Sequence, residues 1–155
     1  MNRIIIYTDG GCRGNPGIGG WGVWLRYGDH DKKLQGAQQD TTNNRMELTA
    51  AIKALEAIKS SDIAIDLFTD SKYVVDSVEK KWVLGWEKKG FSGKKNSDLW
   101  MRFLKIYRRH IVRFQWIKGH NNHMQNERCD FLAVEASKKE KVRIDTFYES
   151  QNNLQ

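Results

Sequence analysis

Two short segments of the chain end in the same way, with an aromatic residue, a threonine and an aspartate. They are residues 7–9 and 68–70, and each follows an apolar, β-branched run typical of a buried strand. Ligands of open α/β sheets bind beyond the carboxyl ends of parallel strands, which lie about 4.8 Å apart. On neighbouring strands, Asp9 and Asp70 would therefore face one crevice and could share divalent metal ions. Either aspartate alone could instead begin a turn or cap a helix, but the repetition favours the metal site.

Two further carboxylates, Glu47 and Asp130, are predicted in the first turns of two helices. Glu47 lies at the edge of an apolar stripe, and taken alone it is best interpreted as a partner of the helix dipole. Four clustered acids would repel one another unless cations neutralised them, and oxygen ligands favour Mg²⁺, whereas zinc prefers Cys or His. Two such ions can activate water and stabilise the leaving oxygen in phosphodiester hydrolysis. Four unrelated surface acids remain the alternative.

A polar loop precedes Asp130 and contains His120 and His123. An imidazole there could move a proton near neutral pH, although a solvated surface histidine is the plainer interpretation. The two cysteines form no Cys-x-x-Cys motif, so a redox pair is not favoured. We expect Cys129 in the core and Cys12 as a loop contact.

Hydrophobic periodicity predicts alternating strands and helices. A glycine-dense loop is expected over residues 10–20, and the apolar stripe of the first helix contains Leu48, Ala51, Ile52, Leu55 and Ile58. The strands are expected at residues 3–9, 21–27, 33–39, 63–69 and 112–117. The helices are expected from residues 41–44 to about Lys59, near 71–80, in a short segment after 80, from a Ser97-Asp98 cap to about Arg109, and over 126–139.

This order of elements predicts an α/β fold. The first three strands should pair as an antiparallel meander, while strands separated by helices imply parallel crossovers. We therefore expect one domain over residues 1–155, built on a five-stranded mixed sheet flanked by helices, with a weakly ordered tail after about residue 141.

Positive charge is concentrated in one segment. The formal net charge is +7, and residues 79–118 contain twelve Lys or Arg but only three acids. Trp82, Trp86, Phe91 and Trp100 are interleaved with these lysines. Lysines neutralise phosphates and aromatic faces can stack on sugars or bases, so the segment suits a polyanionic partner. An amphipathic helix with buried tryptophans and solvated lysines explains the pattern equally well.

The sequence shows no secretory signal and no apolar run long enough to span a membrane. With only two cysteines, the chain is expected in a reducing, cytoplasmic setting. At 155 residues it is long enough to bury a core without disulfides or a structural metal.

Four spaced motifs closely resemble bacterial type 1 ribonuclease H (ribonuclease HI). They are Tyr-Thr-Asp-Gly at 7–10 with Gly-Asn-Pro-Gly at 14–17, Thr-Asn-Asn-Arg-Met-Glu-Leu at 42–48, Thr-Asp-Ser at 69–71, and Lys-Gly-His at 118–120 with Asn-Glu-Arg-Cys-Asp at 126–130. The resemblance runs in order over about residues 3–140. It implies a monomeric enzyme with a ribonuclease H-like fold and a basic handle at about 80–95. It also implies endonucleolytic, Mg²⁺-dependent cleavage of the RNA strand of RNA–DNA hybrids, with Mn²⁺ as a substitute, giving 5′-phosphate and 3′-hydroxyl ends.

The resemblance also implies roles for particular residues. Asp9, Glu47, Asp70 and Asp130 match the metal-binding acids, and the residue that matches Asp70 also helps to orient the attacking water. His120 matches a histidine that assists proton transfer or product release. The implied substrate contacts are Cys12, Asn15, Asn43 and Asn44 in the minor groove, Thr42 in a phosphate pocket, and Lys72, Lys80, Lys81, Trp82, Lys88 and Lys89.

The chain departs from the family pattern at several positions. Lys72 replaces a common Gln, Gly11 replaces Ser, Asn122 and Met124 replace Gly and Pro, and the handle turn at Ser92-Gly93 is short. None alters the four acids, so we expect activity to survive with changed affinity or site preference. A non-catalytic binder that uses the basic segment, and a nuclease of the same fold acting on DNA, remain alternatives.

Overall fold

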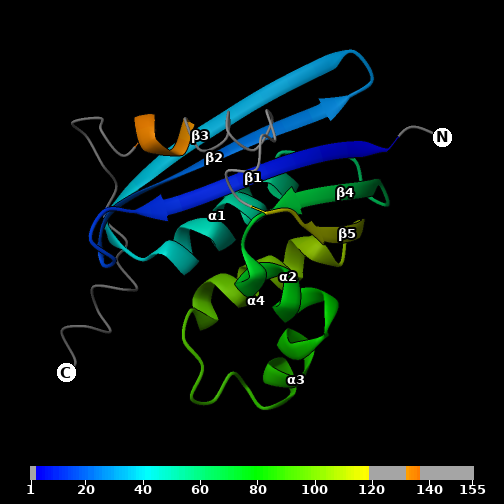
Figure 1. Ribbon diagram of the computed structural model, residues 1–155. Coiled ribbons are helices and arrows are strands. Elements are labelled where there is room, and N and C mark those ends of the chain that lie inside the picture. Colours follow the sequence, from blue (N-terminus) through cyan, green and yellow to red (C-terminus); the bar gives the residue numbers. More distant parts are fainter. Residues whose placement is uncertain (1–2, 119–131, 137–155) are drawn as a thin grey trace.

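A five-stranded mixed sheet forms the centre of the molecule (Figure 1). The computed structural model describes residues 3–118 and 132–136. The strand order is β3-β2-β1-β4-β5, with β1, β2 and β3 paired antiparallel and β1, β4 and β5 paired parallel. The predicted meander and crossovers are therefore confirmed. In the described part of the chain, no helix has the length and apolar character needed to cross a membrane.

The elements alternate largely as the periodicity predicts. The strands are β1 (Ile4–Cys12), β2 (Gly17–Tyr27), β3 (His30–Thr41), β4 (Ala64–Thr69) and β5 (Ile111–Trp116). The helices are α1 (Asn43–Glu56), α2 (Lys72–Glu79), α3 (Trp82–Lys88) and α4 (Ser97–Tyr107), and residues 132–136 are also helical.

The predicted glycine loop over residues 10–20 is wrong in extent. Residues 10–12 belong to β1 and residues 17–20 to β2, and Gly11 lies opposite Gly20 in their antiparallel register. The connection is only residues 13–16. Glycine is needed within these strands because neighbours approach closely: a Cβ at Gly19 would lie 2.5 Å from Thr41 Cγ2 and 2.7 Å from Met46 Cγ.

Two helix boundaries differ from the prediction. Helix α1 ends at Glu56 rather than near Lys59. Helix α4 begins at Ser97, but its cap is Asn96, in a left-handed conformation with φ of 65° and without a capping hydrogen bond from its side chain. The predicted Ser97-Asp98 cap is therefore wrong, since both residues fall within the helix and the Asp98 carboxylate forms a partly buried ion pair with Arg45.

The main core lies between the sheet and the helices. The predicted apolar stripe is confirmed: Leu48, Ala51, Ile52 and Leu55 of α1 are buried, and so is Ile58 just after the helix. The aromatic residues of the basic segment divide between core and surface: Trp100 and Phe91 are buried, whereas Trp82 is 47% exposed. The interpretation with buried aromatic residues therefore holds for Trp100 and Phe91 but not for Trp82.

The helical residues 132–136 lie beside β2 and β3 and are orange in Figure 1. Gln35 Nε2 on β3 donates to the Leu132 carbonyl oxygen at 3.5 Å. Ala133 and Ala136 are buried, as the predicted apolar face requires. Cys129, also predicted on that face, and the tail after residue 141 lie outside the described residues.

A buried carboxylate ties the N-terminus to the edge strand β5. Asp66 on β4 accepts from Arg3 Nε and Nη2, both at 3.0 Å, and from Arg113 Nε at 3.2 Å. These partners, Arg3 foremost, hold the pKa of Asp66 below its usual range. A carboxyl with a lowered pKa contributes stability above its unfolded pKa, and that stability is lost as the pH falls through the folded value.

Replacing Asp66 with Asn is expected to lower the free energy of unfolding by about 1–2 kcal/mol at pH 7, because charge-assisted hydrogen bonds are lost. The difference from wild type should shrink below about pH 4. Urea denaturation between pH 7 and pH 3 measures it. Asp31→Asn is the matched control, since Asp31 is exposed and 3.7 Å from Arg26. A deficit that does not change with pH would contradict this account.

Candidate active site

The two repeated motifs lie side by side where β4 ends, although β1 continues three residues beyond Asp9, to Cys12. Tyr7 and Phe68 are paired in the parallel register, and their rings stack with centroids 5.1 Å apart. This is the last pair of the register, and Asp9 and Asp70 each follow it by two residues. The repetition seen in the sequence is therefore a register match, and it brings the two aspartates to the same edge of the sheet.

The turn after β4 is held by hydrogen bonds on both sides of Asp70. Thr69 Oγ1 accepts from the Ser71 backbone N–H at 3.1 Å, and Ser71 Oγ caps α2 by accepting from the Val74 N–H at 3.2 Å. Trp116 Nε1, at the end of β5, donates to the Asp70 carbonyl oxygen at 3.0 Å. These contacts fix the backbone from which the Asp70 carboxylate projects.

Gly10 allows helix α1 to pass close to β1. A Cβ at this position would lie 2.4 Å from the Met46 carbonyl carbon and 2.5 Å from the Glu47 nitrogen. Both are backbone atoms, so a side chain at residue 10 could be accommodated only by moving the helix. The close approach places Glu47 beside Asp9. Gly10 is a site residue that sequence reasoning missed, although its place directly after Asp9 is a visible signal.

The carboxylates of Asp9, Glu47 and Asp70 converge. One oxygen from each lies within 4.8 Å of the other two. Asp9 and Glu47 are buried and Asp70 is half-buried. Burial, followed by the charges of Asp9 and Asp70, raises the pKa of Glu47 well above its usual range. The cluster is therefore electrostatically unfavourable unless a proton or a cation neutralises it.

The donor set fits a hard divalent cation. It consists only of carboxylate oxygens, which Mg²⁺ and Mn²⁺ accept readily. Glu47 Oε1 is buried without a hydrogen-bond partner among the described residues, as expected of a ligand atom directed at an ion. The predicted sharing of a metal site by Asp9, Glu47 and Asp70 agrees with this geometry.

The interpretation of Glu47 as a partner of the helix dipole is wrong. Helix α1 begins at Asn43, so Glu47 is beyond the first turn, which contains no acidic residue. The dipole effect falls off within that turn. Glu47 instead faces the two aspartates, a relation that could not be read from its position in the apolar stripe.

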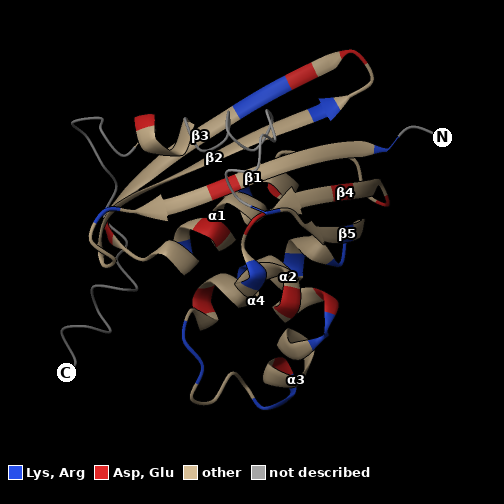
Figure 2. Cartoon of the chain, in the orientation of Figure 1, with Lys and Arg blue, Asp and Glu red and all other residues tan. Residues whose placement is uncertain are grey.

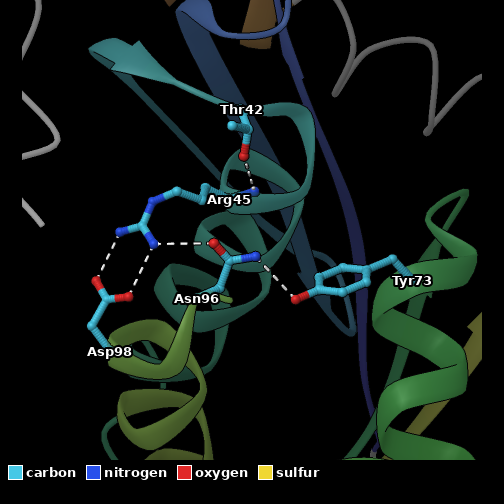
Figure 3. Close-up of polar contacts among 5 residues, drawn as sticks. All are labelled: Thr42, Arg45, Tyr73, Asn96 and Asp98. Atoms are coloured by element: carbon cyan, nitrogen blue, oxygen red, sulfur yellow. Dashed lines mark hydrogen bonds and ion pairs between the residues drawn. The ribbon is translucent and has the colours of Figure 1, made fainter. Parts of the chain in front are cut away.

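A buried polar network anchors the start of α1 (Figure 3). The Arg45 guanidinium, 2% exposed, donates to both carboxylate oxygens of Asp98 at 2.9 and 2.7 Å and to Asn96 Oδ1 at 3.2 Å. Asn96 Nδ2 donates to the Tyr73 hydroxyl at 3.1 Å, and Thr42 Oγ1 caps the helix by accepting from the Arg45 N–H. The network ties α1, two residues before Glu47, to α2 and α4. Arg45 is a second residue that sequence reasoning missed.

Three of the predicted minor-groove contacts lie together near the start of α1. Asn15 Oδ1 accepts from the Asn43 backbone N–H at 3.0 Å, and Asn44 is the next exposed residue. Cys12 Sγ donates to the Thr41 carbonyl oxygen at 3.2 Å, and burial raises the pKa of its thiol. Cys12 belongs to β1 rather than to a loop, as its pairing with Gly19 shows.

The basic handle, residues 80–95, contains α3 and the turn that follows it. In Figure 2 the ribbon around α3 is blue at several Lys and Arg positions. Lys80 Nζ lies 5.2 Å from the centre of the exposed Trp82 ring, and Lys94 Nζ lies 5.1 Å from that of Trp86. A pocket of about 640 Å³ is lined by Lys81, Trp82, Gly85, Trp86, Lys89, Ser92 and Lys94. Lysines and exposed aromatic faces thus share one surface, as binding to a nucleic-acid strand requires.

Several predicted site residues lie outside the described part of the chain. Asp130, the fourth predicted acid, and His120 are among them, as are His123, Asn122 and Met124. Lys72 is described: it is the first residue of α2, exposed, with its Nζ 4.7 Å from the centre of the Trp116 ring.

Comparison with known proteins identifies relatives over most of the chain. The family model described as RNase H matches residues 1–138. A protein named Ribonuclease H from Ruthia magnifica is 62% identical over 138 residues, which cover 86% of this chain and 94% of the relative. A protein named Ribonuclease HI from Campylobacter jejuni is 51% identical, covering 90% of this chain and 94% of the relative.

Solved structures show the same fold. LC9-RNase H1, described as a type 1 RNase H with the type 2 active-site motif, superposes with a TM-score of 0.80 at 31% identity, covering 88% of this chain and 72% of that one. LC11-RNase H1, solved in complex with an RNA/DNA hybrid, has a TM-score of 0.65 at 30% identity, covering 86% of this chain and 96% of that one.

Proposed function

The chain belongs to the RNase H family, as a bacterial type 1 member, and from this premise we propose that Asp9, Glu47, Asp70 and Asp130 form its metal-binding catalytic centre. The enzyme hydrolyses the RNA strand of RNA–DNA hybrids. The observation that carries the proposal is the convergence, within 4.8 Å, of three carboxylates that lie on β1, directly after β4 and on α1. Asp130 is assigned by its motif alone, since it lies outside the described residues.

Mg²⁺ is the proposed cofactor, with Mn²⁺ as a substitute and two ions bound when substrate is present. When bound, the ions would supply an activated water and charge stabilisation at the leaving oxygen, giving 5′-phosphate and 3′-hydroxyl ends. Asp9 and Glu47 would act as ligands. Asp70, held by the turn contacts around Thr69 and Ser71, would also orient the attacking water. His120 would move a proton near the leaving group or assist product release.

Substrate contacts are proposed on two surfaces. Asn15, Asn43 and Asn44, with Cys12, would sense the minor groove, where 2′-hydroxyls distinguish RNA from DNA. Thr42 and the basic handle would bind phosphates of the DNA strand, with Trp82 against a sugar. This assignment is supported by the exposed Trp82 ring and by the exposed lysines around it. We also propose that the enzyme acts as a monomeric single domain in the cytoplasm.

One assay tests the function directly. End-labelled RNA is presented as an RNA–DNA hybrid, as duplex RNA and as a single strand, each with Mg²⁺, Mn²⁺ or a chelator. We expect cleavage of the hybrid alone and only with metal. A protein that binds the hybrid but is inert with both metals would indicate a non-catalytic binder. Cleavage of an all-DNA duplex at a comparable rate would indicate a DNA-acting relative.

The handle lysines are expected to control the salt dependence of hybrid binding. Each lysine that neutralises a phosphate contributes about one to the slope of log K against log salt. Replacing four of them with Gln should weaken binding and flatten the slope by up to about four. The substituted residues are Lys80, Lys81, Lys88 and Lys89, and fluorescence anisotropy over a salt series measures the slope.

The matched control removes the same charge elsewhere. It replaces four lysines outside the handle with Gln: Lys32, Lys33, Lys59 and Lys105. Because net charge falls equally in both variants, a flattened slope in the handle variant alone identifies direct phosphate contacts. Equal slopes in the two variants would show that the handle lysines are only solvated.

A further inference from the structure

Trp116 links the last strand of the sheet to the backbone that carries Asp70. Its indole Nε1–H donates to the Asp70 carbonyl oxygen at 3.0 Å, across 46 positions of sequence. The next residue, Ile117, donates its backbone N–H to the Thr69 carbonyl oxygen at 2.9 Å. Side chain and backbone at the end of β5 thus hold consecutive carbonyl groups of the turn after β4.

Packing alone does not account for this tryptophan. Trp116 is 44% exposed and is not part of the main core cluster, whereas Phe114, two residues earlier on the same strand, is 3% exposed and belongs to it. The large side chain at position 116 therefore contributes little to the core. Its hydrogen bond is instead to the turn after β4 that carries Asp70.

The Trp116 ring also supports a cation. Lys72 Nζ lies 4.7 Å from the ring centre, within the range of a cation–π interaction. Lys72 is the first residue of α2, where a positive charge opposes the helix dipole, and the first turn of α2 contains no acidic residue. The charge is therefore at a place that is unfavourable for the helix, two residues from Asp70.

We propose that Trp116 is a positioning residue for two groups of the active site. Its N–H holds the peptide of Asp70, so that the carboxylate keeps its place in the cluster with Asp9 and Glu47. Its ring holds the Lys72 ammonium beside this cluster, where the ammonium meets a phosphate oxygen of the nucleic-acid substrate. This inference rests on the proposed function, because both groups act on that substrate.

The two roles can be separated by substitution. Trp116→Phe and Trp116→Tyr keep an aromatic face for Lys72 but lack the indole N–H. Lys72→Met keeps the side-chain length but removes the charge. Lys33→Met is the matched control, because Lys33 of β3 is also a lysine placed over a tryptophan, with its Nζ 5.3 Å from the centre of the Trp24 ring on β2.

Metal binding without substrate is the first measurement. Mn²⁺ titration by calorimetry, and the rise in melting temperature that Mn²⁺ produces, report the carboxylate cluster directly. We expect Trp116→Phe and Trp116→Tyr to weaken Mn²⁺ affinity about 3–10-fold, because a displaced ligand costs binding. Lys72→Met and Lys33→Met should not weaken it.

Kinetics on the hybrid give the second measurement. The two aromatic variants should lower kcat about 10-fold with little change in KM, since the loss concerns geometry at the reacting phosphate. Lys72→Met should raise KM about 3–10-fold, and Trp116→Leu should show both effects. Adding Lys72→Met to Trp116→Leu should raise KM little further, because the support of the lysine is already gone.

Measurements on the wild-type protein distinguish a failure of the proposed function from a failure of the positioning role. If wild type neither binds Mn²⁺ nor cleaves the hybrid, the proposed function fails. Suppose instead that wild type does both. If the aromatic variants then match wild type in Mn²⁺ affinity and kcat, and if Lys72→Met, like Lys33→Met, leaves KM at the wild-type value, the positioning role of Trp116 is overturned. Additive KM effects of Trp116→Leu and Lys72→Met would overturn the support of Lys72 by the ring.

Discussion

Replacing Asp70 with Asn is expected to abolish hydrolysis of the hybrid while leaving hybrid binding largely intact. Asn keeps the shape of the side chain but removes the charge from a cluster whose three carboxylates lie within 4.8 Å. We expect a loss of about 10³-fold or more in kcat with Mg²⁺, or ~4 kcal/mol of transition-state stabilisation. Single-turnover cleavage measures the first effect, and anisotropy with a labelled hybrid measures the second.

The melting temperature of Asp70→Asn without metal is an independent test of the carboxylate cluster. The charges of Asp9 and Asp70, added to burial, raise the pKa of Glu47, so the cluster is repulsive in the metal-free protein. Asp70→Asn should therefore raise the melting temperature without metal and reduce the further rise that Mg²⁺ produces.

Asp76→Asn on α2 is the matched control for Asp70→Asn. Asp76 is partly exposed, 3.8 Å from Lys80, and away from the carboxylate cluster. It should change neither kcat nor the response to metal. Full activity of Asp70→Asn with Mg²⁺ would contradict the proposed mechanism.

Gly10→Ala is expected to damage both stability and the metal site. The added Cβ would lie 2.4–2.6 Å from backbone atoms of Met46 and Glu47, and no side-chain rotation can relieve these contacts. Helix α1 must move, at a cost of about 2–3 kcal/mol in the free energy of unfolding. Because Glu47 moves with it, kcat should fall about 10²-fold, as for a misplacement of about 1 Å. Urea denaturation and Mn²⁺ titration measure the two effects.

Gly11→Ala provides the comparison one residue away. The nearest atom to a Cβ at Gly11 is Asn43 Oδ1 at 4.0 Å, so this variant should unfold within about 0.5 kcal/mol of wild type and bind Mn²⁺ normally. Both variants add the same methyl group to β1. Wild-type stability and Mn²⁺ affinity in Gly10→Ala would show that α1 does not depend on this close approach.

The fold was predictable because its elements have clear local patterns. The segments that lead to Asp9 and Asp70 are apolar and β-branched, and the apolar stripe of α1 has helical spacing. The type and the order of these secondary-structure elements therefore follow from periodicity. The glycine segment 10–20 was not predictable in the same way. Glycine favours loops in isolation, whereas here Gly11 and Gly20 face each other in paired strands.

The division of the basic segment into core and surface also required the structure. Trp82 and Trp100 occur in the same pattern of lysines and aromatics, yet Trp82 is 47% exposed and Trp100 is fully buried. A periodic pattern gives the face of a helix, but burial depends on which other elements cover that face. For the same reason, Ser97 and Asp98 could be read as a helix cap, whereas in the structure the buried Arg45 binds the Asp98 carboxylate.

The sequence by itself determined the chemistry of this protein: carboxylates in two repeated motifs, a local excess of positive charge, and motifs that identify the family. Only the tertiary structure decided which groups hold these carboxylates in place. Glu47 became a ligand candidate rather than a dipole partner because α1 begins at Asn43 and passes close to Gly10. Trp116 reaches Asp70 across 46 residues. Residue types carry chemistry locally, whereas distances between remote backbone segments arise only from packing.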